Sequence, residues 1–280
     1  PGDARSAAKL GDLGLDGTPA VWVTGNVNFL ENDGADTAFD GELYTPLAGA
    51  DYVTEDGWVF GLALGYERSD LDTAFNGGSL GSNGFVVGPY LGRSVTEDVI
   101  VDAGFGYAYL DYDRERFDGT RTLDASFDAN RLYAFVNATG YMPQDVHGVQ
   151  GLTLSGRVGW RYSNEYQSSF TEGGVAVTGG RVELGQVVLA GEASYVPDLG
   201  IEQVIEVVAS AEGNIDAVRS ERDRAEGFAG DSDDRTDVIL GLRINALLAE
   251  GVTADLGYTH MLSREDSSDI GVSAGLRFEF

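Results

Sequence analysis

The sequence contains no cysteine, only two histidines and no apolar run of 18 residues. Without cysteine the chain has no disulfide bond, no thiol nucleophile and no thiolate metal site. Without a long apolar run it has no transmembrane helix. Basic residues are also scarce, because 18 Lys+Arg stand against 46 Asp+Glu and leave a net charge of −28. This acidic balance argues against binding to nucleic acid.

The first residues, PGDARSAAKLGDLG, lack an apolar core of signal-peptide length, as expected of a mature chain or a fragment. Glycine, by contrast, is abundant at 40 residues, there are 13 tyrosines, and the hydrophobic content of 42% suffices for a folded domain. Transmembrane β-strands need only roughly 9–11 alternating residues and give a weak hydropathy signal. The alternation of apolar and polar residues along the chain is therefore the test for a transmembrane β-barrel.

Alternation is clearest in GLTLSGRVGWRYS (151–163), where every second residue from Leu152 to Tyr162 is apolar or glycine. The same pattern occurs at 57–67, 99–112, 237–246, 252–259 and 270–280. Weaker candidate strands occupy residues 20–30, 39–53, 84–94, 126–142, 180–195 and 201–213. The faces of 126–142 are mixed, and the apolar parity in 180–195 switches near Gly185, which suits a β-bulge. The total is 12 strands.

The connections between these strands alternate in length. After the even strands they are short: TED, TE, PQDVHG, VPDLG and LAEG. After the odd strands they are usually long and polar: SDLDTAFNGGSLGSN, DRERFDGTRTLDAS, SNEYQSSFTEGGVAVTGG and NIDAVRSERDRAEGFAGDSDD. Short turns at one end and long loops at the other are typical of outer-membrane barrels. We therefore predict an all-β fold, a 12-stranded antiparallel transmembrane β-barrel over residues 19–280, in the bacterial outer membrane, with extracellular long loops and periplasmic termini.

Aromatic residues of the apolar face form two groups near the strand ends. The group at the short turns is Tyr52, Trp58, Tyr195, Phe278 and Phe280, and the group near the long loops is Tyr66, Tyr107, Tyr109, Trp160, Tyr162 and Tyr258. Two such belts around an aliphatic band are expected at membrane interfaces. The alternative is the ordinary preference of aromatic residues for strands.

The apolar face must point to lipid, because a one-residue slip would turn Arg157 into hydrocarbon at a cost of about 2–4 kcal/mol. The opposite face then lines the lumen. The candidate lumen-facing charges are Asp102, Arg157, Arg161, Arg243, Asp255 and Glu279. This face is also rich in glycine, which either leaves room inside or lets bulky neighbours lie against the backbone. The acidic balance predicts a preference for cations in any open pore.

Residues 1–18 are a separate segment, a linker or plug. Asp3 is a candidate N-cap, Ala4 to Leu10 are mostly helix formers, and Gly11 is a candidate C-cap. The short helix could enter the lumen, with Asp3, Arg5, Lys9 and Leu10 as the plug residues, because buried charges must find partners. The alternative is a frayed terminus, since two turns are marginal alone.

The chain ends in GVSAGLRFEF, another alternating segment. An open strand edge in hydrocarbon would leave backbone groups unpaired, so this last strand must pair with the first. Its Phe278 and Phe280 resemble the carboxyl-terminal signal of outer-membrane barrels that the barrel assembly machinery reads. We therefore predict that these two residues form an assembly signal.

Three segments resemble the translocator β-domain of autotransporters, the type V secretion family: GADYVTEDGWVFGLALGYERSD (49–70), GPYLGRSVTEDVIVDAGFGYAYLDYDRER (88–116) and GLRINALLAEGVTADLGYTH (241–260). The resemblance covers residues 20–280, including the final LRFEF. It implies a barrel that exports or anchors an upstream passenger and keeps a linker helix in its pore. The first asparagine is Asn26, in the first strand, so the self-cleavage known in part of the family is not carried over.

The partners expected from this resemblance are the lipid bilayer and lipopolysaccharide, the barrel assembly machinery and the chain's own passenger. The alternative function is a passenger-free small diffusion channel or a structural outer-membrane protein. A long β-helical region upstream of Pro1 would favour the first function, and a signal peptide directly before it would favour the second.

The sequence does not suggest an enzyme. His147 lies in a short turn and His260 near the other end of its strand, so the two should be too far apart for a shared metal or catalytic dyad. An outward His260 could belong to a lipase-like site, but we prefer the interpretation that it is a polar interfacial residue. We predict no catalytic residue, no cofactor and no metal site.

Overall fold

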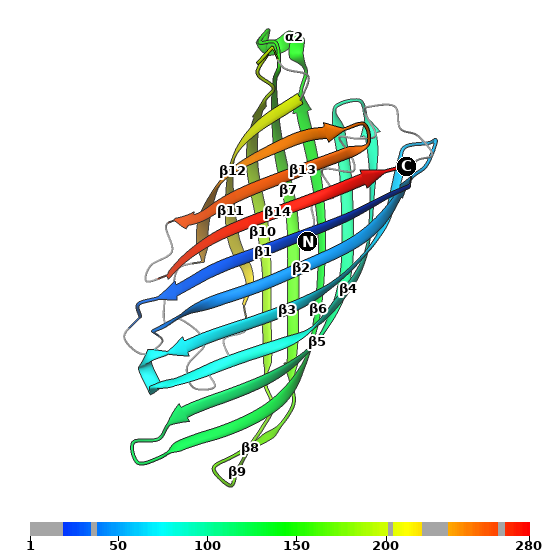
Figure 1. Ribbon diagram of the computed structural model, residues 1–280. Helices are drawn as coiled ribbons and strands as arrows, with labels where there is room; N and C mark the ends of the chain where they lie inside the picture. The colour runs from blue at the N-terminus through cyan, green and yellow to red at the C-terminus, as the bar shows by residue number, and fades with distance from the viewer. Residues whose placement is uncertain (1–18, 35–37, 201–203, 220–234, 263–266) are drawn as a thin grey trace.

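The computed structural model describes residues 19–34, 38–200, 204–219, 235–262 and 267–280. Twelve antiparallel strands form one closed barrel in the order β1-β14-β13-β12-β11-β10-β7-β6-β5-β4-β3-β2 (Figure 1). This confirms the predicted fold class and strand number. The strands of the barrel are β1 (Pro19–Asn32), β2 (Phe39–Val53), β3 (Trp58–Thr73), β4 (Gly78–Thr96), β5 (Val99–Phe117), β6 (Thr122–Met142), β7 (Leu152–Gln167), β10 (Arg181–Tyr195), β11 (Val204–Arg219), β12 (Thr236–Ala249), β13 (Val252–Leu262) and β14 (Ser267–Glu279).

The remaining elements are short. A hairpin of β8 (Phe170–Glu172) and β9 (Val175–Val177) lies between β7 and β10, at the end of the barrel opposite to the single helical turn α2 (Gln144–His147) (Figure 1). A 3-10 turn, η1 (Ala74–Asn76), connects β3 to β4. Within the described ranges, no helix has the length and apolarity to cross a membrane.

The first and last strands close the barrel. They pair from Ala20 opposite Glu279 to Asn32 opposite Ser267. The amide of Phe280 adds one more bond, to the carbonyl of Pro19 at 3.1 Å. No backbone edge of the barrel is therefore left open, as a hydrocarbon environment requires.

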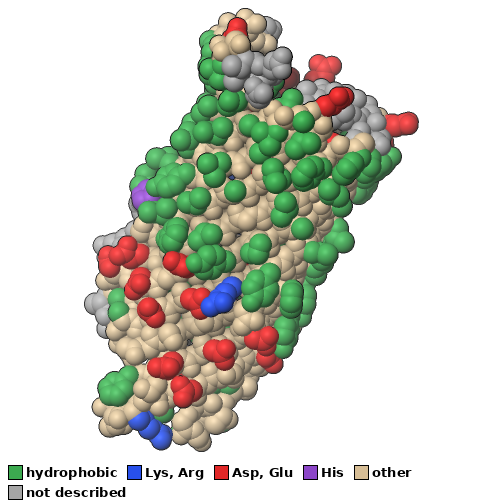
Figure 2. Space-filling model, in the orientation of Figure 1, with side chains coloured by type: hydrophobic (Ala, Val, Ile, Leu, Met, Phe, Trp, Pro, Cys, Tyr) green, Lys and Arg blue, Asp and Glu red, His purple; other side chains and the backbone are tan. Residues whose placement is uncertain are grey.

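The outer wall is apolar over the half of the barrel nearer α2 (Figure 2). Large side chains point outward from the wall, such as Leu64, which is 56% exposed, and Phe85, which is 71% exposed. Successive side chains of a strand point to opposite faces, so the alternation in the sequence becomes an apolar outside and a mostly polar inside.

Two of the predicted long loops are wrong. In the segment 69–83, β3 runs to Thr73 and β4 begins at Gly78, and in 113–126 only residues 118–121 lie between β5 and β6. The sequence misled because many outward residues at these ends of the strands are acidic: Asp70, Asp72, Asp113, Glu115 and Asp124. In water the outward face of a strand can be polar while its backbone pairing continues, so the strands extend beyond the apolar band.

The structure also settles the two irregular segments. In β6 the outward residues are polar from Asp124 to Asn130 and apolar from Leu132, which explains its mixed faces. A bulge does lie beside Gly185, but not on the predicted strand, because β10 stays in unbroken register with β7 from Arg181 to Tyr195 and keeps its parity. Gly185 pairs with Val218 whereas Gln186 pairs with Asp216, so the extra residue is Ala217 on β11.

Candidate functional site: the barrel interior

The interior contains ion pairs between strands that are not neighbours. Arg131 on β6 binds Glu67 on β3, although β4 and β5 separate these strands in the wall. Such a contact is possible only through the lumen. Inner-facing charges therefore pair with one another across the barrel, and three networks show how.

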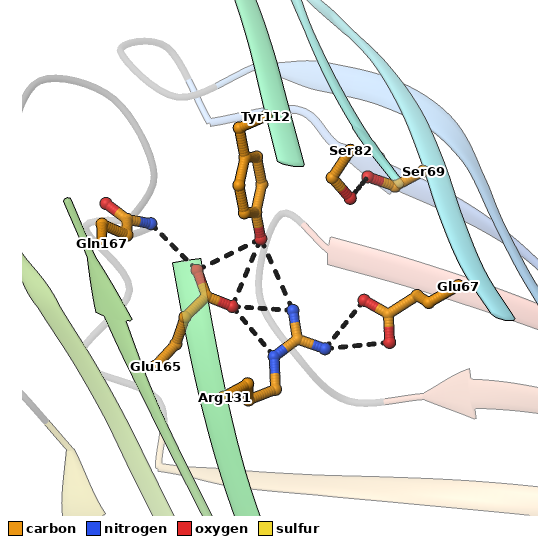
Figure 3. A network of polar contacts seen from close by, with 7 residues as sticks. All are labelled: Glu67, Ser69, Ser82, Tyr112, Arg131, Glu165 and Gln167. Atoms are coloured by element: carbon orange, nitrogen blue, oxygen red, sulfur yellow. Dashed lines mark hydrogen bonds and ion pairs between the residues drawn. The ribbon is translucent and has the colours of Figure 1, made fainter. Parts of the chain in front are cut away.

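The first network surrounds Arg131 (Figure 3). The Nη1 atom of Arg131 lies 2.8 and 2.9 Å from the carboxylate oxygens of Glu67, and its Nε donates to Oε2 of Glu165 at 2.9 Å. The hydroxyl of Tyr112 and the amide of Gln167 donate to Glu165 as well, at 3.1 and 3.0 Å. One guanidinium thus stands between two carboxylates, and the extra negative charge is stabilised by neutral donors.

The second network lies at the end of the barrel where β1 begins and β14 ends. Arg277 binds Asp51 through two bonds of 2.7 and 2.9 Å, and its Nε donates to Glu279 at 2.9 Å. Tyr90 donates to the same Asp51 at 2.9 Å, and the indole of Trp22 donates to Tyr90 at 3.0 Å. This network joins β14 to β2 and β4 on the inside of the closing seam.

The third network joins β7 to β10 and β11. Arg157 and Arg161 both bind Glu212, the latter at 3.2 Å. Arg161 also donates to the side chain of Gln186 at 2.6 Å, and Gln186 donates to Asp216 at 2.6 Å. Here two guanidinium groups share Glu212 and Asp216 adds a second carboxylate, so the charges of this network balance, unlike those of the first two networks.

The residues predicted to face the lumen have the following positions. Arg157 and Arg161 are in the third network, and Glu279 is in the second. Arg243 on β12 lies 3.5 Å from Glu192 on β10. Asp102 on β5 is 7% exposed and accepts a bond of 2.8 Å from Asn137, and Asp255 on β13 is opposite Gly275.

The plug residues Asp3, Arg5, Lys9 and Leu10 lie outside the described residues. Sequence reasoning did not single out several members of the networks: Trp22, Asp51, Glu67, Tyr90, Tyr112, Arg131 and Glu165. Strand parity alone would have placed most of them inside. Their pairing had no local signal, since Asp51 and Arg277 are 226 positions apart.

At several positions an aromatic ring packs directly against the backbone of an inward-facing glycine. A side-chain carbon on Gly106 would overlap the ring of Tyr133, one on Gly104 would overlap Phe135, and one on Gly61 would overlap Tyr90. Of the two roles that the sequence left open for these glycines, close approach of bulky neighbours therefore applies here. The rings lie flat on the wall instead of crossing the lumen.

Apolar side chains line part of the interior too. Leu80, Ala108, Leu110, Tyr112 and Ala129 form a buried cluster on the inner faces of β4, β5 and β6. Tyr112 stacks on Phe127, which stacks on Phe170 of the β8–β9 hairpin, with ring centroids 5.0 and 4.8 Å apart. The hairpin thus packs against the inner side of this wall.

An ion pair holds the same hairpin. Glu172 on β8 is 4% exposed, and its carboxylate lies 2.5 Å from Nη2 of Arg116 and 3.6 Å from Nε of Arg114, both on β5. Among the described residues, no group of three His, Cys, Asp or Glu has an arrangement that could hold a metal ion. His147 lies in α2 and His260 lies in β13.

The predicted assembly signal lies at the closing seam. Phe278 is 36% exposed and Phe280 is 75% exposed. Phe278 is opposite Val21 of β1 on one side and Val252 of β13 on the other, so both phenylalanines have the outward parity of β14.

Residues 21–259 match the family described as the autotransporter beta-domain. No curated protein matches the sequence. Among solved structures, the translocator domain of the autotransporter NalP from Neisseria meningitidis is similar over 99% of this chain and 95% of its own, with a TM-score of 0.77 and 14% identity. The β-domain of the Bordetella autotransporter BrkA is similar over 95% of this chain and 100% of its own, with a TM-score of 0.78 and 14% identity.

A third similar structure is the transport unit of the autotransporter AIDA-I from Escherichia coli. It is similar over 94% of this chain and 90% of its own, with a TM-score of 0.69 and 12% identity. At these identities the likeness concerns the fold, and the family match rests on the sequence.

Proposed function

Because this chain belongs to the autotransporter β-domain family and is an outer-membrane translocator barrel, we propose that its interior is the route of an upstream polypeptide to the cell surface. The observation that carries this proposal is the inner face itself. Its charges are tied to one another by networks such as that of Arg131, so the wall is polar but rigid. A passing chain needs polar surroundings for its backbone groups, and a fixed wall offers them without collapsing onto the chain.

The proposed orientation has both termini in the periplasm and the β8–β9 end outside the cell. Two features support it. The even number of strands brings Pro19 and Phe280 to the same end, which suits insertion from one side of the membrane. Acidic side chains gather on the outer wall at the opposite end, beyond the apolar band (Figure 2). Asp72 and Glu115 are examples, near the ends of β3 and β5 that are far from Pro19 and Phe280.

We propose that residues 1–18 occupy the lumen as a short plug after export. The support is electrostatic: Asp3, Arg5 and Lys9 carry charges of both signs, as do the inner networks. Phe278 and Phe280 would be read by the barrel assembly machinery. The outer wall would contact phospholipid and lipopolysaccharide. The proposed reaction is vectorial transport, in which no covalent bond is formed or broken.

The test is a reporter peptide fused directly before Pro1, with an epitope inserted at Asp118 in the β5–β6 connection as a control for orientation. Protease added to intact cells should cleave both the reporter and the epitope. If the epitope is cleaved but the reporter stays protected in the periplasm, the export proposal is wrong. In that case an ion conductance of the purified barrel would favour the passenger-free channel.

A further inference from the structure

A cluster of polar and aromatic side chains interrupts the outward face of β7 and β10, just beyond the apolar band. On β7 it consists of Tyr162, Asn164 and Tyr166. On β10, Glu183 is opposite Asn164 and Arg181 is opposite Tyr166, so all five side chains share the outward parity. We call these five residues the Arg181 platform.

The platform holds the guanidinium of Arg181 in one position. Its Nε donates to Oδ1 of Asn164 at 3.0 Å, and its plane lies over the ring of Tyr166, with Cζ 5.3 Å from the ring centroid. Asn164 is only 5% exposed and is itself fixed, because its Nδ2 donates to the hydroxyls of Tyr166 and Tyr162 at 3.1 and 3.3 Å. The side chain of Arg181 nevertheless remains 47% exposed.

The neighbours of the platform give its height in the membrane. Tyr162 of the platform itself belongs to the predicted aromatic belt near the long loops, and Arg181 lies beyond it, opposite Tyr166 of the same strand β7. The next outward row toward the apolar band contains Leu132 beside Asn164. The next outward row away from it begins with the carboxylate pair of Asp111 and Asp128. Arg181 therefore lies at the boundary where lipid headgroups lie.

We propose that the Arg181 platform binds a phosphate group of a lipid headgroup in the leaflet at the β8–β9 end of the barrel. This inference rests on the proposed orientation, in which that leaflet consists of lipopolysaccharide. A planar guanidinium matches the geometry of phosphate, and pre-organisation reduces the entropy lost on binding. Stacking on Tyr166 and the bond to Asn164 supply that pre-organisation.

Two other charged side chains help to test whether Arg181 binds phosphate: one competes for it and one is a control. Glu183 lies 3.1 Å from Nη2 of Arg181 and competes with a phosphate for it. Arg68 is also on the outer wall, at 58% exposure, but it pairs with Asp70 at 2.9 Å and has no buried asparagine beneath it. Arg68 is therefore the matched control, an outward arginine of the same surface without a platform.

The experiment is native mass spectrometry of the folded barrel after incubation with diphosphoryl lipid A in detergent. The wild type should retain one lipid A. Arg181→Gln should reduce its occupancy about tenfold, the loss expected for one charge-assisted phosphate contact. Arg68→Gln should leave the occupancy unchanged. Glu183→Gln should raise it, because the competing carboxylate is removed. Gel mobility before and after heating verifies that each variant is folded.

Two probes identify the source of binding. A phosphate-free diacylglycerol should not be retained, and excess inorganic phosphate should not displace lipid A, since acyl chains contribute to the complex. The proposal is overturned if the wild type retains no lipid A, if Arg181→Gln and Arg68→Gln behave alike, or if diacylglycerol binds equally well. Displacement by inorganic phosphate would overturn the lipid assignment in favour of a free-anion site. None of these readings depends on export of a reporter, so this inference and the translocation route can fail separately.

Discussion

Arg277 offers the sharpest test of what holds the closing seam together. Its side chain is 10% exposed and that of its partner Asp51 is 1% exposed, so the ion pair is almost fully removed from water. In Arg277→Met, Tyr90 would be the one hydrogen-bond partner left to the Asp51 side chain among the residues that the structure describes. Leaving one charge of a buried pair without its partner costs about 3–5 kcal/mol in the free energy of unfolding. We expect a loss of that size.

The assay is urea unfolding of the barrel in phospholipid vesicles, followed by the gel mobility of unheated samples. The control is Arg68→Met, because its pair with Asp70 is more than half exposed on both sides and should contribute only about 0–1 kcal/mol. The double variant Arg277→Met/Asp51→Leu should recover part of the loss, since the carboxylate of Asp51 is removed whereas that of Glu279, 9% exposed, still lacks its partner. If Arg277→Met is no less stable than Arg68→Met, the seam does not depend on this pair.

Deletion of Phe280 should lower the yield of barrel in the outer membrane more than Asp118→Ala does, and equal yields on heat-modifiable gels would contradict the assembly signal. Deletion of residues 1–18 should raise single-channel conductance in planar bilayers and lower the melting temperature modestly, whereas an unchanged conductance would argue against the plug. The side chain of Thr120 and two backbone amides donate to Asp118 and lower its pKa to about 2. The stabilisation of this turn should therefore be complete above pH of about 4, the usual pKa of aspartate, and be lost as the pH falls through about 2. Carboxyl NMR titration checks this value, and Thr120→Ala should raise it.

The sequence was sufficient to predict the barrel, because alternation is a local property. Every second residue of the segment ending in Phe280 is apolar, and lipid on one side of the wall makes that parity obligatory. Closure followed from the same physics, since an unpaired edge cannot exist in hydrocarbon. The pairing of β1 with β14 required no sequence signal of its own.

Strand length and lumen contents could not be predicted in the same way. The alternation signal ends where the outward face meets water, so residues 69–83 resembled a loop although most of them are paired. Inside, the partner of a charge depends on the shear and width of the barrel. Nothing near Arg131 in the sequence indicates that it meets Glu67, 64 positions away.

The inner face of the barrel differs between β5 and β6 on one side and β13 and β14 on the other. Four bulky inner side chains, Tyr112, Arg131, Tyr133 and Phe135, belong to β5 and β6, where glycines such as Gly104 and Gly106 let the rings lie flat. The inner residues of β13 and β14 are mainly small: Thr253, Gly257, Thr259, Gly271, Ser273 and Gly275. A passing polypeptide would lose least side-chain freedom on the side that offers small polar groups, because few long side chains would need to be ordered there. The crowded side, fixed by the bonds of Arg131, then acts as the rigid support against which the barrel keeps its shape.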